Sequence, residues 1–389
     1  MAILGEVFSI IRNGASIKQI DGANGFPITR IETISNRVID RNRLGYANVF
    51  DITEYESYVL QSGDILMSHI NSEKHLGKTA LYIKKGNEKI IHGMNLLMLR
   101  ANSEVILPLY AKYFFDSNLF LKQIPNITKK SVNQASFTVT ALKKLEIKIP
   151  QMVEQKRIID IMSRLDNIIQ YRKDQLEKLD LFVKSRFIEM FGDPASNPHK
   201  FTKVPLSELA DIKIGPFGSL LHKEDYIENG NPVVNPSHIV NGNIVVDSRL
   251  TISNEKYEEL AAYKLEIGDV VLGRRGEMGR CAVVQKEGFL CGTGSVIIRT
   301  KGEVTSDYIQ QIISFPTFKR TIEDMAVGQT MPNLNVPIVS NFLITKPPVE
   351  IQKRYYDFVA QVDKSKLAIQ QSLDELETLK KSLMQQYFG

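Results

Sequence analysis

Two stretches of this sequence carry basic side chains, one together with glycines and the other with an asparagine, and each lies shortly after a Gly-Asp pair. The stretch that follows Gly268-Asp269 is Arg274-Arg275-Gly276-Glu277-Met278-Gly279-Arg280. Its counterpart after Gly63-Asp64 is His69-Ile70-Asn71-Ser72-Glu73-Lys74-His75, with Lys78 shortly beyond. Arginine can bind a guanine edge with two hydrogen bonds, and asparagine can do the same for adenine. The two stretches therefore predict loops that read DNA bases, with ordinary solvated loops as the alternative.

A second pair of stretches carries lysine, hydroxyl and amide side chains near the end of each half of the chain. They are Thr128-Lys129-Lys130-Ser131-Val132-Asn133-Gln134 and Gly328-Gln329-Thr330-Met331-Pro332-Asn333. Such side chains make many protein contacts to phosphates and base edges, although adjacent lysines can also be plain surface charge. The candidate DNA-binding residues are therefore His69, Asn71, Lys74, Lys78, Lys129, Lys130, Gln134, Arg274, Arg275, Arg280, Gln329, Thr330 and Asn333.

Residue patterns that would support catalysis, metal binding or cofactor binding are not found. The run from Ser72 to Thr79 resembles a phosphate-binding loop, but serine stands where the first glycine belongs. Cys281 and Cys291 have no histidine pair nearby, which favours two small core residues over a metal site. The sequence also lacks the Asn-Pro-Pro-aromatic signature of amino-methyltransferases and a glycine-rich loop for a methyl donor. We therefore expect no catalytic residue, no metal and no cofactor in this chain.

The composition is typical of a soluble globular protein with two or three domains. The chain has 389 residues, 43% of them hydrophobic and 24% charged, and one core rarely serves so long a chain. A net charge of +5 permits a polyanionic partner without requiring one. No apolar run could span a membrane, no secretory signal is visible, and only two cysteines occur. We expect a cytoplasmic protein without a membrane partner.

The second half of the chain repeats the first. Residues 150–157 (PQMVEQKR) resemble residues 347–354 (PPVEIQKR), and the offset of 197 positions holds without a gap to Phe191-Gly192 and Phe388-Gly389. A period of half the chain is too long for a solenoid and indicates duplication of a whole domain. The predicted parts are a lobe over 1–150, a shared stretch over 151–192, a second lobe over 193–347 and a second shared stretch over 348–389.

Each shared stretch has the pattern of one long helix. Apolar residues recur at spacings of four and three, which is typical of a coiled-coil seam. Equivalent copies would pair antiparallel, with approximate two-fold symmetry and a lobe at each end, and forty residues would span roughly 60 Å. The alternative is that each helix merely covers its own lobe. The predicted pairing residues are Ile158, Met162, Leu165, Ile169, Leu176, Leu179, Val183, Val359, Val362, Ile369, Leu373, Leu376 and Leu383.

Both lobes have a mixed α/β (α+β) pattern. Strand-like runs such as 96–99 and 295–298 precede helix-like runs such as 109–116 and 306–314. The Gly-Asp pair in each lobe most simply predicts a tight turn before a buried strand. The fold expected is therefore two similar globular domains separated by a pair of long antiparallel coiled-coil helices.

This combination of two lobes, each followed by a related helix that begins Pro-x4-Gln-Lys-Arg, resembles the specificity subunit of Type I restriction-modification systems. The resemblance covers essentially the whole chain. It implies two target-recognition domains, each of which reads one half of a bipartite, asymmetric site in double-stranded DNA. It also implies that the helices act as a spacer and dock two methyltransferase subunits. Restriction subunits with ATP-driven translocation would join them, and methyl donor, ATP and magnesium would belong to these partners.

The first lobe departs from the second where it has Arg12-Asn13-Gly14-Ala15-Ser16 in place of the turn Gly215-Pro216-Phe217-Gly218. This departure leaves the bases that each lobe reads undetermined. Two alternatives to a non-catalytic recognition subunit stay open. One is the specificity chain of a related combined restriction and methylation enzyme, and the other is a structural coiled-coil protein that bridges partners.

Overall fold

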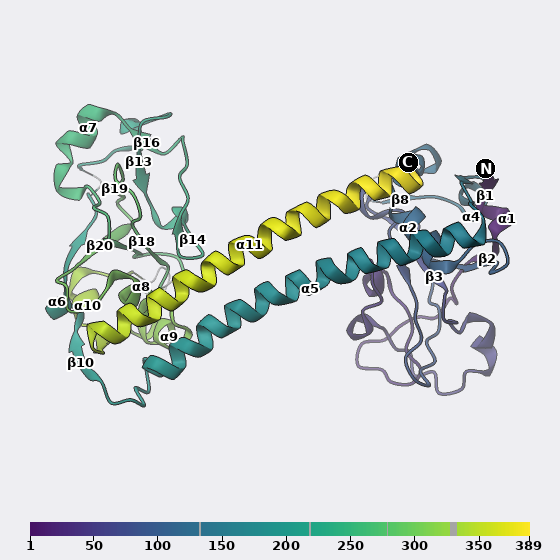
Figure 1. The fold of residues 1–389 in the computed structure, drawn as a ribbon, viewed down its shortest axis with the longest axis horizontal. Helices are drawn as coiled ribbons and strands as arrows, with labels where there is room; N and C mark the ends of the chain where they lie inside the picture. The colour runs from purple at the N-terminus through teal and green to yellow at the C-terminus, as the bar shows by residue number, and fades with distance from the viewer. Residues whose placement is uncertain (132–133, 218, 278, 327–332) are drawn as a thin grey trace. The chain divides into compact units, whose positions relative to one another are not determined.

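The computed structural model of this protein describes residues 1–131, 134–217, 219–277, 279–326 and 333–389. The chain divides into two compact units: unit 1 is Met1–Asp174 with Ile369–Gly389, and unit 2 is Gln175–Ala368. Both units contain a segment of each long helix, α5 (Met152–Phe191) and α11 (Val349–Phe388), which are labelled in Figure 1. The helices are thus divided between the two lobes and do not form bodies of their own.

A four-stranded antiparallel sheet forms the centre of each lobe. In unit 1 the strand order is β2 (Phe8–Asn13), β6 (Leu96–Ala101), β3 (Ile65–Ser68) and β5 (Thr79–Leu81). In unit 2 the equivalent order is β11 (Ala210–Ile214), β20 (Ser295–Thr300), β17 (Val270–Gly273) and β18 (Cys281–Val283). Helices pack on one face of each sheet, so each lobe is an α+β domain, in agreement with the predicted fold class.

Both faces of each central sheet are buried, which explains the uninterrupted apolar runs in its strands. Successive side chains of a strand point to opposite faces. In β3, Met67 therefore joins a core with helices α2 (Pro108–Asp116) and α3 (Asn118–Ile127), whereas Leu66 joins a second cluster on the other face. In unit 2 the helices α8 (Ser306–Ser314) and α9 (Pro316–Met325) take the places of α2 and α3.

Shorter elements complete the lobes. Those of unit 1 are β1 (Ala2–Ile3), α1 (Leu4–Val7), β4 (Ile70–Asn71), β7 (Lys129–Lys130), β8 (Ala135–Ser136), α4 (Val139–Lys143), β9 (Glu146–Ile147) and the 3-10 helices η1 to η4, at Ile31–Ile34, Arg41–Arg43, Thr53–Tyr58 and Glu73–His75. Those of unit 2 are β10 (Thr202–Pro205), α6 (Leu206–Leu209), β12 (Tyr226–Ile227), β13 (Asn231–Val234), β14 (Ile239–Val240), β15 (Asn243–Ile244), β16 (Thr251–Ile252), α7 (Asn254–Glu259), β19 (Leu290–Cys291), α10 (Val336–Ser340), β21 (Leu343–Lys346) and the 3-10 helices η5 to η7, at Lys223–Asp225, Pro236–His238 and Ala261–Tyr263.

The Gly-Asp pair makes a tight turn before a buried strand in both lobes, as predicted. The Asp64 carboxylate accepts two hydrogen bonds of 2.7 Å from the Arg100 guanidinium and one of 2.7 Å from the backbone N–H of Gln61. Asp269 is bound in the same way by Arg299, at 2.8 Å twice. Both carboxylates are almost fully buried, and a buried charge needs a partner of this kind. The aspartate therefore has a structural role at the start of β3 and β17.

The glutamine of the Pro-x4-Gln-Lys-Arg motif joins each long helix to its lobe. The fully buried Gln155 side chain accepts from the Leu107 backbone N–H at 2.9 Å, just before α2, and donates to the Pro150 carbonyl at 3.0 Å. Gln352 repeats this arrangement with the Thr305 N–H at 2.8 Å and the Pro347 carbonyl at 2.9 Å. One amide thus satisfies two backbone groups that burial would otherwise leave unpaired.

Within each unit, segments of α5 and α11 lie side by side and antiparallel. In unit 1, Asp166 binds Lys380, and Lys173 lies 3.0 Å from Glu377. Residue numbers therefore increase along α5 while they decrease along the paired segment of α11. In unit 2, Lys366 lies 2.6 Å from Asp180. The predicted pairing residues Ile158, Met162, Leu165, Ile169, Val362 and Leu373 are buried, and Leu176, Leu179, Val183, Val359, Ile369, Leu376 and Leu383 are half-buried.

The long helices pair with each other and also cover the lobes, so the alternative that each merely covers its own lobe does not hold. Ile158 and Met162 belong to the core of unit 1, and Leu383 packs against that core. Val183 and Val359 do the same in unit 2. Among the helices in the described part of the chain, none is long and apolar enough to span a bilayer.

Candidate nucleic-acid interface

A small three-stranded sheet brings the two predicted DNA-binding stretches of unit 1 together. Strand β8 pairs with β4 on one side and with β7 on the other, so Asn71 and Lys130 both lie opposite Ala135. The Lys130 ammonium lies 2.6 Å from the Glu73 carboxylate and ties the two stretches together across the surface. Segments about sixty residues apart in the sequence therefore form one surface.

Unit 2 repeats the same backbone contact. The N–H of Leu334 donates to the Arg274 carbonyl at 3.0 Å, just as the N–H of Phe137 donates to the His69 carbonyl at 3.1 Å. An isolated bridge joins Arg275 to Asn333, which stand where Ile70 and Ser136 pair in unit 1. The candidates Gln329 and Thr330 lie outside the described residues. Both lobes thus place the loop after the central strand beside the segment that precedes the long helix.

Glycines bring further loops to the same edge of each central sheet. A Cβ at Gly14, directly after β2, would lie 2.2 Å from the carbonyl oxygen of Gly93. At the equivalent place in unit 2, a Cβ at Gly215 would lie 2.0 Å from the Gly292 carbonyl oxygen. Only glycine permits so close an approach of two backbones. The loop after β2 therefore meets the loop before β6, and the loop after β11 meets the loop before β20. These contacts lie at the end of each sheet where β3 and β17 terminate, which is called the candidate DNA-binding edge.

The structure corrects the prediction that His69 and Arg274 contact DNA, because neither side chain is exposed to solvent. His69 is 5% exposed, its ring packs edge-on against Phe137, and burial lowers its pKa to about 4. Arg274 is 8% exposed, and its Nε donates to the Asn333 side-chain oxygen at 3.0 Å and to the Leu334 carbonyl at 3.2 Å. Burial, followed by the charge of Arg275, lowers the pKa of Arg274. Both residues, together with Asn333, hold the two segments of the interface to each other.

The physical reason is that the pre-helix segment covers the residue directly after β3 and β17. Phe137 packs against the ring of His69 in unit 1, and Asn333 and Leu334 accept hydrogen bonds from the Arg274 side chain in unit 2. His69 and Arg274 are therefore buried, whereas Arg275 is exposed. Residue type alone could not distinguish the two adjacent arginines.

The other candidates differ in how free their side chains are. The side chains of Lys74, Lys78, Lys129, Gln134 and Arg275 make no hydrogen bond or ion pair within the described residues, and all but half-buried Lys78 are exposed. By contrast, Asn71 binds Ser72 and Ser68, and Arg280 binds Glu277 at 2.7 Å and the Pro236 carbonyl at 3.3 Å. Free lysines and arginines are suited to phosphates and base edges, because no internal partner competes for them.

The sequence interpretation missed two residues at this surface of unit 2. Phe217 is 60% exposed on the glycine-rich turn after β11, and apolar side chains in such places can contact a thymine methyl group or a base step. Lys319 lies 3.1 Å from Glu277 and lines a cavity of about 350 Å³ with Arg280. The Gly-Pro-Phe-Gly run was a signal for Phe217, whereas only the packing of α9 places Lys319 here.

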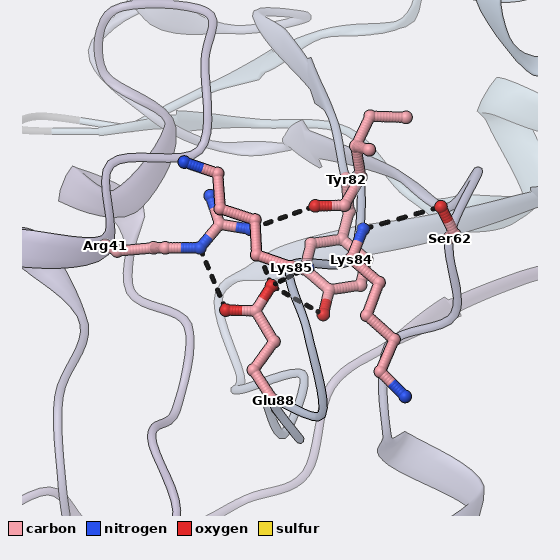
Figure 2. Close-up of polar contacts among 7 residues, drawn as sticks. Arg41, Ser62, Tyr82, Lys84, Lys85 and Glu88 are labelled. Carbon is pink, nitrogen blue, oxygen red and sulfur yellow. Dashed lines mark hydrogen bonds and ion pairs between the residues drawn. The ribbon is translucent and has the colours of Figure 1, made fainter.

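The opposite edge of the unit 1 sheet is held by a polar network, shown in Figure 2. Glu88 accepts from Arg41 Nε at 2.9 Å, from Tyr82 Oη at 3.1 Å and from the Lys85 backbone N–H at 2.8 Å. The Arg41 hydrogen bond is the main cause that lowers the pKa of Glu88 to about 2, and burial raises the pKa of Tyr82 to about 12. These contacts fix the loop after β5, at the end of the strand remote from the interface.

The described residues contain no candidate metal site, and both cysteines are buried. Within the described ranges no group of three or more histidine, cysteine, aspartate or glutamate side chains could hold a metal ion. Cys281 and Cys291 are buried free thiols, and burial raises the pKa of both.

Comparisons with known proteins agree with this geometry. The family model of the Type I restriction modification DNA specificity domain matches residues 2–180 and 198–378, one match for each lobe. A putative type I restriction enzyme specificity subunit of Methanocaldococcus jannaschii, MjaX, is 30% identical over 98% of this chain and 90% of its own length. A second subunit from that organism, MjaVIII, is 21% identical over 88% of this chain and 82% of its own length.

Solved structures show the same fold. A chain from a solved type I R-M system superposes with a TM-score of 0.64 and 19% identity, over all of this chain and 96% of the other. The S subunit of a Type I restriction-modification system from M. genitalium superposes with a TM-score of 0.56 and 14% identity, over 98% of this chain and 94% of the other. With two matches to the family model and a relative along nearly its whole length, this chain belongs to the specificity subunits of Type I restriction-modification systems.

Proposed function

We propose that each lobe reads one half of a bipartite DNA site through the sheet edge described above, without catalysis by this chain. The observation that carries the proposal is the repeated backbone contact between the post-strand loop and the pre-helix segment, with free basic or amide side chains beside it. A subunit that recognises two different half-sites needs the same scaffold twice and different side chains on each copy. Cytoplasmic location is part of this proposal, since the buried free thiols fit a reducing compartment.

Individual residues have distinct expected roles. Arg275 is exposed, and its side chain has no partner among the residues that the structure describes, so we assign it to a guanine edge in the major groove. Gln134 is the corresponding base-reading candidate in unit 1, where an amide favours adenine. We assign the exposed Lys74 and Lys129 to phosphates, because phosphate contacts position a lobe on the duplex without specifying the sequence.

The long helices are proposed to space the lobes and to dock two methyltransferase subunits. Support comes from apolar side chains on α5 that are left exposed, among them Ile168, Tyr171, Leu181 and Ile188. Exposed apolar surface of this kind is typical of protein interfaces. Restriction and translocase subunits would complete the assembly, and methyl donor, ATP and magnesium would be bound by those partners.

The test is a map of methylated bases in DNA from cells that carry this chain and its methyltransferase partner, compared with cells that lack this chain. We expect one split motif with two short specified halves around a fixed unspecified gap. Equal binding of all duplexes by the complex would refute sequence recognition. Methyl transfer by this chain alone would instead favour a combined enzyme, and absence of DNA binding in the complex would favour a bridging protein.

A further inference from the structure

Unit 1 contains a cavity of about 710 Å³ that the proposed DNA recognition does not use. Its walls come from residues 37–39, from β5, from the junction of α2 and α3, and from the facing segments of α5 and α11. Apolar side chains such as Ile39, Leu109, Ile169 and Phe388 form much of the lining. The volume lies within the roughly 300–1,000 Å³ of ordinary ligand sites, so the cavity can accept a short peptide segment.

Basic side chains exceed acidic ones in the lining by five to three. The basic residues are Arg37, Lys112, Lys173, Lys380 and Lys381, and the acidic residues are Asp116, Asp166 and Glu377. Arg37 and Lys112 share the single carboxylate of Asp116, and Lys112 is only 8% exposed. Lys381 has no ion pair within the described ranges. The surplus of positive charge suits a ligand that carries a carboxylate.

Unit 2 shows what fills the equivalent place there. Phe191 packs on Tyr308 with ring centroids 5.1 Å apart, and Phe388 packs on Tyr110 at the same 5.1 Å, so the ends of α5 and α11 are equivalent. After α5 the chain turns back, and Asp193 accepts a hydrogen bond of 2.9 Å from the Thr317 hydroxyl, while Pro194 becomes buried.

The site of that hydrogen bond corresponds to a wall of the unit 1 cavity. Thr317 is the second residue of α9, and the second residue of the equivalent helix α3 is Leu119, which lines the cavity. The protein's own linker, through Asp193, therefore covers in unit 2 a position that is hollow in unit 1.

Smaller side chains explain why unit 1 is hollow at this point. In unit 2, Phe187 and Phe315 pack with ring centroids 5.6 Å apart between the long helix and the lobe. Their equivalents in unit 1 are Met384, four residues before Phe388, and Ser117, between α2 and α3. Both of these residues line the cavity.

We propose that the unit 1 cavity docks an acidic peptide segment of a partner protein, with an aspartate beside a proline or another apolar residue. The segment would occupy the place that Asp193-Pro194 takes in unit 2. Because Leu119 stands there instead of Thr317, its carboxylate would bind Lys381 rather than a hydroxyl group. The residues that line this cavity are not among the candidate DNA-binding residues, and peptide binding tests the proposal independently of the proposed function.

The first experiment measures binding of a fluorescein-labelled peptide with the sequence of residues 192–198, GDPASNP, to the full chain by fluorescence anisotropy. We expect saturable binding that weakens at least tenfold when the peptide aspartate is replaced by asparagine. The Lys381→Gln variant should bind several-fold more weakly, whereas Lys89→Gln, an exposed lysine outside the cavity, should bind as the parent does. Equal binding of the aspartate and asparagine peptides would overturn the proposal.

A second experiment supplies the segment within the same molecule. Appending a copy of residues 193–198 after Gly389 gives the segment a high effective concentration, and we expect a higher Tm that the Asp-to-Asn extension does not produce. The double variant Ser117→Phe with Met384→Phe should fill the cavity and abolish peptide binding, while the methylated-base map stays unchanged. The proposal would be overturned if the free peptide did not bind and the appended segment did not raise the Tm. It would also be overturned if the peptide bound to the Ser117→Phe, Met384→Phe variant as it does to the parent.

Discussion

The two lobes share a backbone scaffold and differ in the side chains that it carries. In both, the residue after the central strand is buried and its carbonyl accepts a hydrogen bond from the pre-helix segment, but that residue is His69 in unit 1 and Arg274 in unit 2. The aspartate turn and the buried glutamine are repeated with nearly the same distances. Duplication thus preserved what holds the interface in place and left the residues at its surface free to diverge.

The lobes also differ in how their supporting regions are filled. Unit 2 packs aromatic rings around Phe187 and Phe191, whereas unit 1 has a cavity beside Met384. Conversely, unit 1 ties the loop after β5 with the Arg41–Glu88–Tyr82 network, and Val284 stands at the position of Tyr82 in unit 2. The two copies of the fold therefore differ in these two places, where unit 2 has additional aromatic packing and unit 1 has an additional network of charged hydrogen bonds.

The largest expected effect is from truncation of the phenylalanine that ends each long helix. Phe191→Ala should cost about 4 kcal/mol and Phe388→Ala about 3 kcal/mol of local stability, typical of buried aromatic truncations. The difference follows because Phe191 contacts the rings of Phe187, Tyr308 and Tyr355, whereas Phe388 contacts Tyr110 and lies beside a cavity. Hydrogen exchange of peptides from each unit measures both losses. Equal losses of stability would mean that the additional aromatic contacts of Phe191 in unit 2 do not contribute to local stability.

A smaller, pH-dependent effect is expected from Glu88→Gln, which should destabilise unit 1 by about 2 kcal/mol at pH 7, as for a lost charged hydrogen bond. The pKa of Glu88 is lowered from 4.5 to about 2, so its contribution is complete above pH 4.5 and is lost as the pH falls toward 2. The difference between parent and variant in hydrogen exchange of unit 1 should shrink from pH 5 to pH 3. The exposed Glu54→Gln variant is the control, and a difference that grew with acid would contradict this assignment.

Substitution of Arg275 should change recognition of only one half-site, the one read by unit 2. Arg275→Ala should weaken binding of the cognate duplex by about 1–3 kcal/mol and relax one position in the half-site read by unit 2. Binding measurements with the methyltransferase complex on duplexes substituted in either half-site check this. If the half-site read by unit 1 relaxed as well, the lobes would not be independent readers.

The smallest effect is expected from Lys129→Ala in unit 1. A lysine that neutralises one phosphate should weaken binding to all sequences alike and lower the salt dependence of log K by about one. Titrations over a range of salt concentrations measure this slope, with Lys89→Gln as a control away from the interface. A change in sequence preference with an unchanged slope would assign Lys129 to a base instead.

The sequence by itself determined the duplicated plan of this protein. The repeat offset and the heptad pattern predicted two long helices, and the apolar runs predicted buried strands after the Gly-Asp turns, because these features depend on local periodicity. The Pro-x4-Gln-Lys-Arg repeat was visible too, but the role of its glutamine depends on backbone groups far away in the chain.

Tertiary structure alone decided which candidate residues face outward. His69 and Arg274 have the residue types of DNA-reading side chains, yet contacts with the pre-helix segment bury both of them. The contact between residues 69–71 and 135–137, the meeting of Gly14 with Gly93, and the cavity beside Met384 all join segments that are distant in sequence. Local patterns carry no information on such contacts, because the packing of the whole lobe sets which side chains are buried and which remain free to bind.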